Sequence, residues 1–295
     1  VEAEGAALLK NQNAALPLAQ GAKVSLFGHG SVDLMYGGTG SGSVDTSKAP
    51  NFKQALEDQG IQVNSTLWDL YSSDDMMKNY SRITPAAISD TLEANTQYAV
   101  NEAPWSKLSS AESSFADYGD AAIVVFSRSG GEGADLPNSL EALRDYMTDG
   151  DYLQLCAEER ALLDNLMQLK QDGVFKKVIV ILNSSSTLQL DFIDDYDIDA
   201  LLWVGNLGLN GIPAVADILA GKVNPSGRIV DTFQKDNHAA PAMQNYDAYP
   251  YTNAAELGLA AAQNNNALGI DKCNQNYVVY QEGIYVGYRY FETRY

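Results

Sequence analysis

The chain has 295 residues, and its 38 acidic and 19 basic side chains give a formal net charge of −19 at pH 7. This charge argues against nucleic acids and anionic membrane surfaces as partners, since both are bound through basic patches. A neutral partner such as a sugar is compatible with it. The apolar content of 45% is ordinary for a globular protein, and no apolar stretch is long enough to span a membrane.

Cysteine and histidine are scarce. The two cysteines, Cys156 and Cys273, make neither a disulfide framework nor a zinc site. No cluster of His, Cys and acidic residues has metal-ligand spacing, so neither a metal nor a cofactor is predicted. The chain starts at Val1 without a visible signal peptide. We expect it to be a piece of a longer protein, so the missing signal says little about localisation.

Strand-like and helix-like segments alternate along the chain. Residues 1–20 open with a helical pattern that breaks at Asn11–Asn13. Strands are predicted at residues 23–29, 61–67, 121–128, 176–182 and 200–204, and helices at 52–58, 158–171 and 212–219. The tyrosine-rich end, residues 277–295, is predicted to form strand and turn. This alternation indicates an α/β fold with a doubly wound, mostly parallel sheet.

The predicted domain is single and covers residues 1–295. Its sheet core is expected at about residues 20–233, followed by a long C-terminal wrap at 234–295. No internal repeat and no clear linker divides the chain.

The sheet is organised around residues 121–137, AAIVVFSRSGGEGADLP. The first half is typical of a strand buried on both faces. In the second half three glycines surround Glu132, and Asp135 follows. Ligand sites in open α/β sheets lie beyond the carboxyl ends of the strands, so Glu132 is predicted at the active edge. A carboxylic acid there can serve as general acid/base; the alternative is an acidic turn in an acidic protein.

A second glycine-rich stretch, GGTGSG at Gly37–Gly42, follows the first predicted strand. Glycine-rich loops often cradle phosphates, but this one lacks a lysine and lies roughly ten residues beyond the strand. These departures disfavour a nucleotide-binding, flavodoxin-like domain. The alternatives are a flexible surface loop and a loop lining a neutral ligand.

A Ser-rich tip, Asn183–Ser186, follows the fourth predicted strand. It could hold a nucleophile only if His29 or His238 approached it. Neither histidine lies in a recognisable context, so no Ser-His-Asp triad is predicted.

Several segments together carry a resemblance to a known family. The chain resembles the α/β-sandwich domain of glycoside hydrolase family 3, the family of many β-glucosidases. The matching segments, in chain order, are EGAALLKNQNAALPL (4–18), GGTGSG (37–42), VVFSRSGGEGADLP (124–137), YLQLCAEERALL (152–163), KKVIVILNSSSTLQL (176–190), ALLWVGNLGLNGIPAVADILAGKVNPSGRIVDTF (200–233) and YQEGIYVGYRYFETRY (280–295). The resemblance implies a six-stranded sheet sandwiched between helices. It also implies retaining hydrolysis of β-linked sugars at a site shared with a second domain.

The resemblance also implies roles for particular residues. Glu132 falls on the general acid/base, in a GEGxD-like loop, and the GGTGSG loop borders the leaving-group subsite. Arg128 and Asp135 are candidates for orienting Glu132 or contacting sugar hydroxyls, and each is equally open to a structural ion pair. The candidate substrate-binding residues of the glycine loop are Gly38, Thr39, Gly40 and Ser41.

One half of the expected chemistry is missing from this sequence. A retaining glycosidase needs two carboxyls about 5–5.5 Å apart. In two-domain members the nucleophilic aspartate lies on a (β/α)8 barrel, and this chain has no room for a barrel of about 250 residues. We therefore expect a barrel domain of the same protein to supply the nucleophile, and the isolated chain to be inactive. The competing hypothesis is a non-catalytic scaffold or carbohydrate-binding module, which would need no acid at Glu132.

Overall fold

A computed structural model of the chain contains one large sheet. It describes residues 1–38, 40–42, 44–80, 100–130, 151–244, 249–259 and 276–294. The six strands are β1 (Ala7–Asn11), β2 (Lys23–Phe27), β3 (Gln62–Val63), β4 (Ala121–Arg128), β5 (Val178–Ser184) and β6 (Ala200–Trp203). Their order is β1-β6-β5-β4-β2-β3, and only the β1–β6 pair is antiparallel. The predicted six-stranded, mostly parallel α/β sheet is confirmed.

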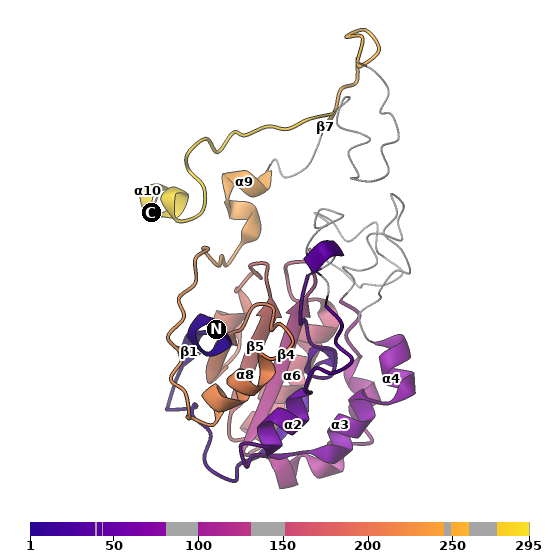
Figure 1. Cartoon of the computed structure of the whole chain (residues 1–295), viewed down its shortest axis with the longest axis vertical. Coiled ribbons are helices and arrows are strands. Elements are labelled where there is room, and N and C mark those ends of the chain that lie inside the picture. The colour runs from indigo at the N-terminus through magenta and orange to yellow at the C-terminus, as the bar shows by residue number, and fades with distance from the viewer. Residues whose placement is uncertain are drawn as a thin grey trace.

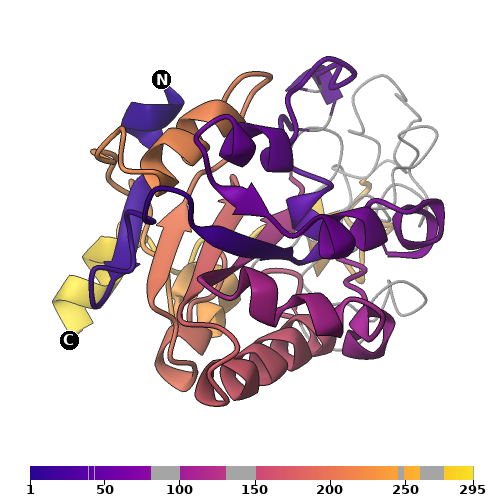
Figure 2. The same ribbon diagram turned by 90° about the horizontal axis from the view of Figure 1, so that it is seen from below.

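Helices cover both faces of this sheet (Figures 1 and 2). The helices of the sandwich are α1 (Glu2–Gly5), α2 (Phe52–Glu57), α3 (Ser65–Tyr71), α4 (Asp74–Asn79), α6 (Ala157–Gln171), α7 (Phe192–Asp195) and α8 (Ile212–Leu219). Helices α2 and α8 pack on one face, and α3, α4, α6 and α7 pack on the other. The sheet therefore lies between two separate apolar layers.

Strand β4 shows why its sequence is almost continuously apolar. All eight of its residues are buried. Ile123 and Val125 point into the α2–α8 layer, whereas Val124 and Phe126 point into the α6 layer. Because successive strand side chains alternate between faces, a strand covered on both sides needs apolar residues at every position.

The N-terminal segment departs from its predicted helical pattern. Only Glu2–Gly5 is helical, and Ala7–Asn11 forms the edge strand β1. Leu8 packs against the α2–α8 layer and Leu9 against the opposite layer, so adjacent leucines serve opposite faces. Successive side chains that point to opposite faces are typical of a strand. The sheet thus begins before residue 20, where its core was expected to start.

Two other predicted strands are shorter than expected. The segment 61–67 yields only the two-residue strand β3, because Asn64 caps α3 by accepting a hydrogen bond from the Leu67 amide (3.2 Å). At the C-terminus, β8 (Asn276–Tyr277) pairs with β7 (Tyr249–Pro250), but Tyr288–Arg294 forms helix α10 instead of strand and turn.

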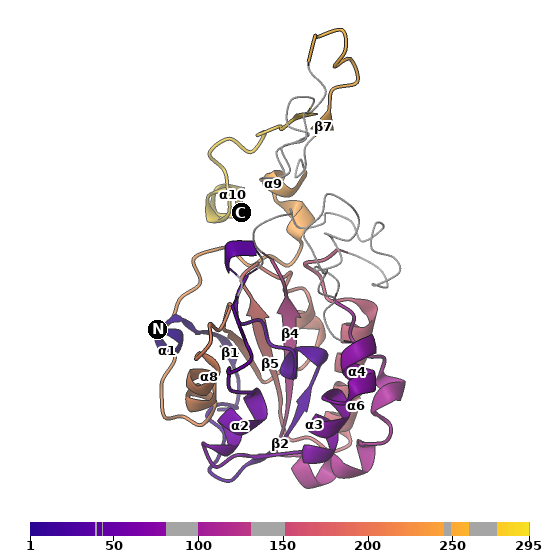
Figure 3. The same ribbon diagram turned by 45° about the vertical axis from the view of Figure 1, so that its right-hand side comes forward.

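The C-terminal segment lies beyond the carboxyl ends of the parallel strands (Figures 1 and 3). It carries α9 (Pro241–Gln244), β7, β8 and α10. Exposed large apolar side chains gather in it, namely Tyr251, Leu257, Tyr277, Val278, Val279, Tyr280, Ile284, Tyr285, Val286 and Tyr288. Within the part of the chain that the structure describes, none of the helices has the length and apolar character needed to traverse a bilayer.

Candidate active site at the carboxyl edge of the sheet

The chain changes direction across the sheet between β2 and β4. From β2 it passes to the edge strand β3 and returns to β4, on the other side of β2. Strands β2 and β4 are parallel neighbours, with Val24 opposite Ala121 and Phe27 opposite Val124. The segments that follow them therefore leave the same edge of the sheet, at the kind of switch point where α/β folds bind ligands.

Some of the predicted site residues lie in the described part of the chain and others do not. Gly38, Gly40 and Ser41 belong to the segment after β2, with Gly40–Gly42 in one 3-10 turn, η2. Glu132 and Asp135 come in the chain just after Gly130, the last described residue beyond β4; like Thr39, they lie outside the described residues. Their roles stay predictions.

Two glycines let the segment after β2 cross closely over the end of β4. A Cβ atom on either Gly28 or Gly30 would lie 2.7 Å from the Val125 carbonyl oxygen, and Gly28 also has a φ of +83°. Both positions thus exclude a side chain by contact, and Gly28 also by conformation. This close approach holds the 3-10 turn η1 (His29–Ser31) against β4.

A buried polar cluster lies beneath this crossing. The Glu102 Oε2 atom accepts hydrogen bonds from the His29 amide (2.8 Å) and lies 2.9 Å from His29 Nδ1. The Tyr71 hydroxyl accepts the Gly28 amide hydrogen (3.1 Å), and burial raises the pKa of Tyr71. Burial lowers the pKa of His29, but the hydrogen bond and charge of Glu102, with the charges of Asp33 and Glu159, outweigh it, so the net shift is upward. Sequence reasoning missed this cluster because Glu102 is 73 residues from His29 in the chain.

The glycine loop is anchored at its base by Asn183, at the carboxyl end of β5. The Asn183 Oδ1 atom accepts the Met35 amide hydrogen (2.6 Å), and Nδ2 donates to the Met35 carbonyl (3.0 Å) and the Gly205 carbonyl (2.7 Å). The amides of Leu207 and Gly208 donate to the carbonyls of Met35 (3.1 Å) and Tyr36 (2.6 Å). The loop after β2 is thereby joined to the ends of β5 and β6.

Arg128 ends β4 as half of a buried ion pair. Its Nη1 and Nη2 atoms lie 2.8 and 2.7 Å from the two carboxylate oxygens of Glu159, and both side chains are fully buried. Nε, Nη1 and Nη2 also donate to the carbonyls of Tyr152 (2.7 Å), Ser127 (3.0 Å) and Gln154 (2.6 Å). A guanidinium has five N–H donors, and these contacts use all five. They favour the structural alternative for Arg128 over contact with sugar hydroxyls.

Within the Ser-rich tip, the hydroxyl of Ser184 bonds to its near neighbour Ser186. The Ser184 hydroxyl donates to the Ser186 carbonyl (2.9 Å) and accepts the Ser186 amide hydrogen (3.1 Å). His29 pairs with Glu102, and His238 lies 3.0 Å from Asp151. The described residues also contain no group of three or more His, Cys, Asp and Glu able to hold a metal ion.

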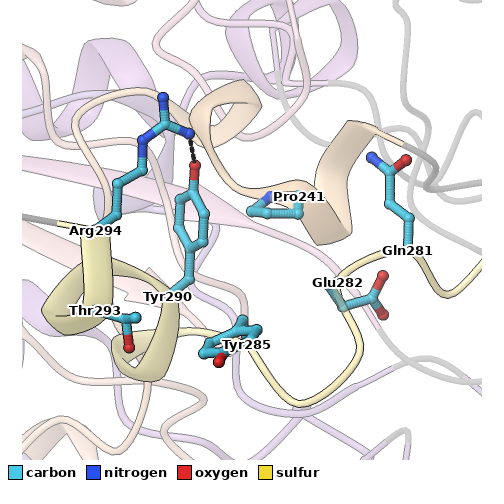
Figure 4. A pocket seen from close by; sticks show the side chains of 7 residues that line it. All are labelled: Pro241, Gln281, Glu282, Tyr285, Tyr290, Thr293 and Arg294. Carbon is cyan, nitrogen blue, oxygen red and sulfur yellow. Dashed lines mark hydrogen bonds between the residues drawn. The ribbon is translucent and has the colours of Figure 1, made fainter.

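A small pocket of about 240 Å³ lies in the C-terminal segment (Figure 4). It is lined by Pro241 from α9 and, from the end of the chain, by Gln281, Glu282, Tyr285, Tyr290, Thr293 and Arg294. Within α10 (Tyr288–Arg294), Arg294 donates a hydrogen bond to the hydroxyl of Tyr290. Three of the tyrosines in this stretch, Tyr280, Tyr285 and Tyr288, are exposed.

The sheet, its two helical layers and its carboxyl-edge loops define a doubly wound α/β domain. The chain belongs to the glycosyl hydrolase family 3 C-terminal domains, because the sequence model of that family matches residues 6–288. The resemblance to glycoside hydrolase family 3 that was inferred from the sequence is therefore confirmed.

Two of the curated relatives are β-glucosidases. The chain is 29% identical over 296 residues to a beta-glucosidase of Ruminococcus albus, covering 99% of this chain and 26% of that protein. It is 30% identical over 310 residues to beta-glucosidase A of Butyrivibrio fibrisolvens, covering 98% of this chain and 31% of that protein. The chain thus spans about a quarter to a third of the length of these relatives.

Solved structures agree in fold. A beta-glucosidase from Paenibacillus barengoltzii matches with a TM-score of 0.70 and 27% identity, over 99% of this chain and 27% of that one. Beta-glucosidase 3B from Thermotoga neapolitana, solved in complex with glucose, matches with a TM-score of 0.68 and 28% identity, over 99% of this chain and 35% of that one.

Proposed function

We propose that this chain is one half of the active site of a retaining β-glycosidase. Glu132 supplies the general acid/base, and the Gly37–Gly42 loop borders the subsite for the leaving group of a β-linked glycoside. A (β/α)8 barrel elsewhere in the same protein supplies the nucleophile. The observation that carries the proposal is the juxtaposition of β2 and β4, which sends the glycine loop and the chain leading to Glu132 from one edge of the sheet.

Two further observations support a second domain. The relatives are roughly three to four times longer than this chain, which leaves ample length for a barrel of about 250 residues. The C-terminal segment also exposes a run of large apolar side chains, from Tyr277 to Tyr288, beyond the carboxyl edge. Contiguous exposed apolar surface is typical of an interaction face. A barrel docked there would face the edge from which Glu132 departs.

The decisive experiment changes Glu132 to Ala in the full-length protein. Formation of the glycosyl-enzyme needs acid assistance only when the leaving group is poor, whereas its hydrolysis needs base assistance for every substrate. A dinitrophenyl glycoside should therefore still give a rapid burst and then stall, while an alkyl glycoside loses about 10²–10⁴-fold in rate. Azide needs no base, so it should restore turnover of the dinitrophenyl substrate and yield a β-glycosyl azide.

A matched control is Glu112→Ala, which removes an exposed carboxylate before β4. It should leave both substrates unaffected. Equal losses for good and poor leaving groups in Glu132→Ala, without an azide effect, would contradict the proposal. The scaffold hypothesis expects no effect of Glu132→Ala on the chemical steps.

A further inference from the structure

Asn183 contacts the chain on which the proposed leaving-group loop is built. Its side-chain amide pairs with both backbone groups of Met35, accepting from the amide and donating to the carbonyl, as a strand neighbour would. The second amide hydrogen goes to the Gly205 carbonyl (2.7 Å). Asn183 and Met35 are both buried. The acceptor and both amide donors therefore have partners in the backbone of two other segments.

The glycine loop begins two residues after this anchor. A Cβ atom on Gly37 would lie 2.7 Å from the Gly42 carbonyl oxygen, so the loop closes tightly on itself. Tyr36, which directly precedes the loop, is held as well: its hydroxyl donates to the carbonyl of Pro50, which follows the loop in the chain (3.0 Å). The place of the loop over the edge therefore depends on where Met35 and Tyr36, at its base, are fixed. Asn183 fixes the first of these from β5.

We propose that Asn183 is a positioning residue that sets the affinity of the site for the leaving-group part of the substrate. The inference rests on the proposed function, in which the Gly37–Gly42 loop borders that subsite. Asn183 touches no substrate and acts through Met35. Other side chains cannot replace it: aspartate would set a carboxylate against two carbonyls, and leucine would leave the Met35 amide and the Gly205 carbonyl without this partner.

The test measures Asn183→Ala in the full-length protein with two substrates of the same sugar. A β-linked disaccharide fills the leaving-group subsite, whereas a glycosyl fluoride does not. A displacement of about 1 Å can cost 10²-fold, so kcat/KM for the disaccharide should fall about 10- to 100-fold. Most of this loss should appear in KM. The fluoride has no sugar leaving group, and its kcat/KM should stay within about threefold of the wild type.

Two further variants keep the test sharp if Asn183→Ala folds poorly. Gly37→Ala disturbs the loop directly and should give the same disaccharide-selective loss. The double variant should lose less than the product of the single effects, because both changes act on one loop. Asn165→Ala is the matched control: the Asn165 amide donates to the Ala161 carbonyl within α6 (2.7 Å), away from the glycine loop, and both substrates should react normally.

Each outcome decides the inference. Equal losses for disaccharide and fluoride, or a normal disaccharide rate in a folded Asn183→Ala or Gly37→Ala protein, would overturn it. Glu132→Ala, assayed alongside, separates this failure from failure of the proposed function. If Glu132→Ala shows leaving-group dependence and azide rescue while Asn183→Ala is unselective, only the role of Asn183 is wrong. If Glu132→Ala lacks both signatures, the function and this inference fall together.

Discussion

The buried pair Arg128–Glu159 predicts a large and specific loss of stability when Glu159 is changed to Ala. Glu159 lies in the first turn of α6 and accepts two hydrogen bonds from Arg128 and one from the Cys156 amide (3.0 Å). Removing it leaves the Arg128 guanidinium fully buried without a counter-charge. An arginine cannot shed its proton to relieve this cost, because its pKa lies far above neutral.

The magnitude follows from the burial of both partners. Breaking a fully buried ion pair by removing one partner costs about 3–5 kcal/mol. Because whole domains are stable by only about 5–15 kcal/mol, the Glu159→Ala variant should unfold at a much lower urea concentration. The matched control is Glu57→Ala on α2, whose partner Lys53 is 2.8 Å away in a partly exposed i,i+4 pair. That change should cost about 0.5 kcal/mol or less.

A double variant separates charge from hydrogen bonding. Replacing both members of a buried pair with apolar residues is often close to neutral. Here Arg128 also satisfies the carbonyls of Tyr152, Ser127 and Gln154, and each would cost about 1–3 kcal/mol if left unpaired. Arg128→Met with Glu159→Leu should therefore stay strongly destabilised. Urea denaturation followed by circular dichroism measures all three variants. A Glu159→Ala loss within about 1 kcal/mol of the Glu57→Ala loss would refute the reasoning.

Two more predictions concern His29 and the isolated chain. The pKa of His29 is raised in the folded protein, so its stabilising contribution is present below about pH 6.5 and is lost as the pH rises through the folded-state pKa. The measurement is the urea midpoint as a function of pH in a Glu2→Gln background, which removes the carboxyl whose pKa is raised to about 7. The midpoint should fall as the pH rises, and adding His29→Asn should abolish this fall. If His29→Asn leaves the pH dependence of the midpoint unchanged, the assignment to His29 is wrong. Under the proposed function the isolated chain holds one of the two required carboxyls, so it should not hydrolyse aryl β-glycosides; turnover by pure protein that disappears in Glu132→Ala would disprove this.

The central strands could be predicted because local sequence and tertiary environment agree there. Strands β4 and β5 are buried on both faces, so their apolar runs identify them without knowledge of the partners. The helix α6 is equally plain, with Leu162, Leu163 and Leu166 buried on one face. The two edge strands, β1 and β3, are short and partly exposed. The adjacent leucines of β1 fit a helical pattern as well as a strand, and β3 is shorter than the predicted strand at 61–67 because α3 begins at Ser65.

The polar framework of the edge could not be predicted in the same way. In the sequence, Asn183 stands out only as the start of a Ser-rich tip. Its hydrogen-bond partner Met35 lies 148 residues away, so no local pattern indicates the contact. Glu102 stands in a polar segment without a regular pattern, and its role appears only when His29 is folded against it. Hydrogen bonds between distant segments leave no periodicity in the sequence. By contrast, the possible ion pair of Arg128 could be named as an alternative because a buried strand ended on a cation.

The side chains of Arg128 and Asn183 have a structural role at the carboxyl edge of the sheet. Arg128 and Asn183 lie opposite Ser184 and Ser127 at the ends of two adjacent strands, β4 and β5. The donors of both side chains are used within the protein, mostly on backbone carbonyls, so neither has one to offer a ligand. Under the proposed function, specificity and proton transfer would therefore come from the loops beyond them. Changes to these two side chains should move the loops, whereas a change at Glu132 should remove the proton transfer itself, and the leaving-group dependence of the rate distinguishes the two.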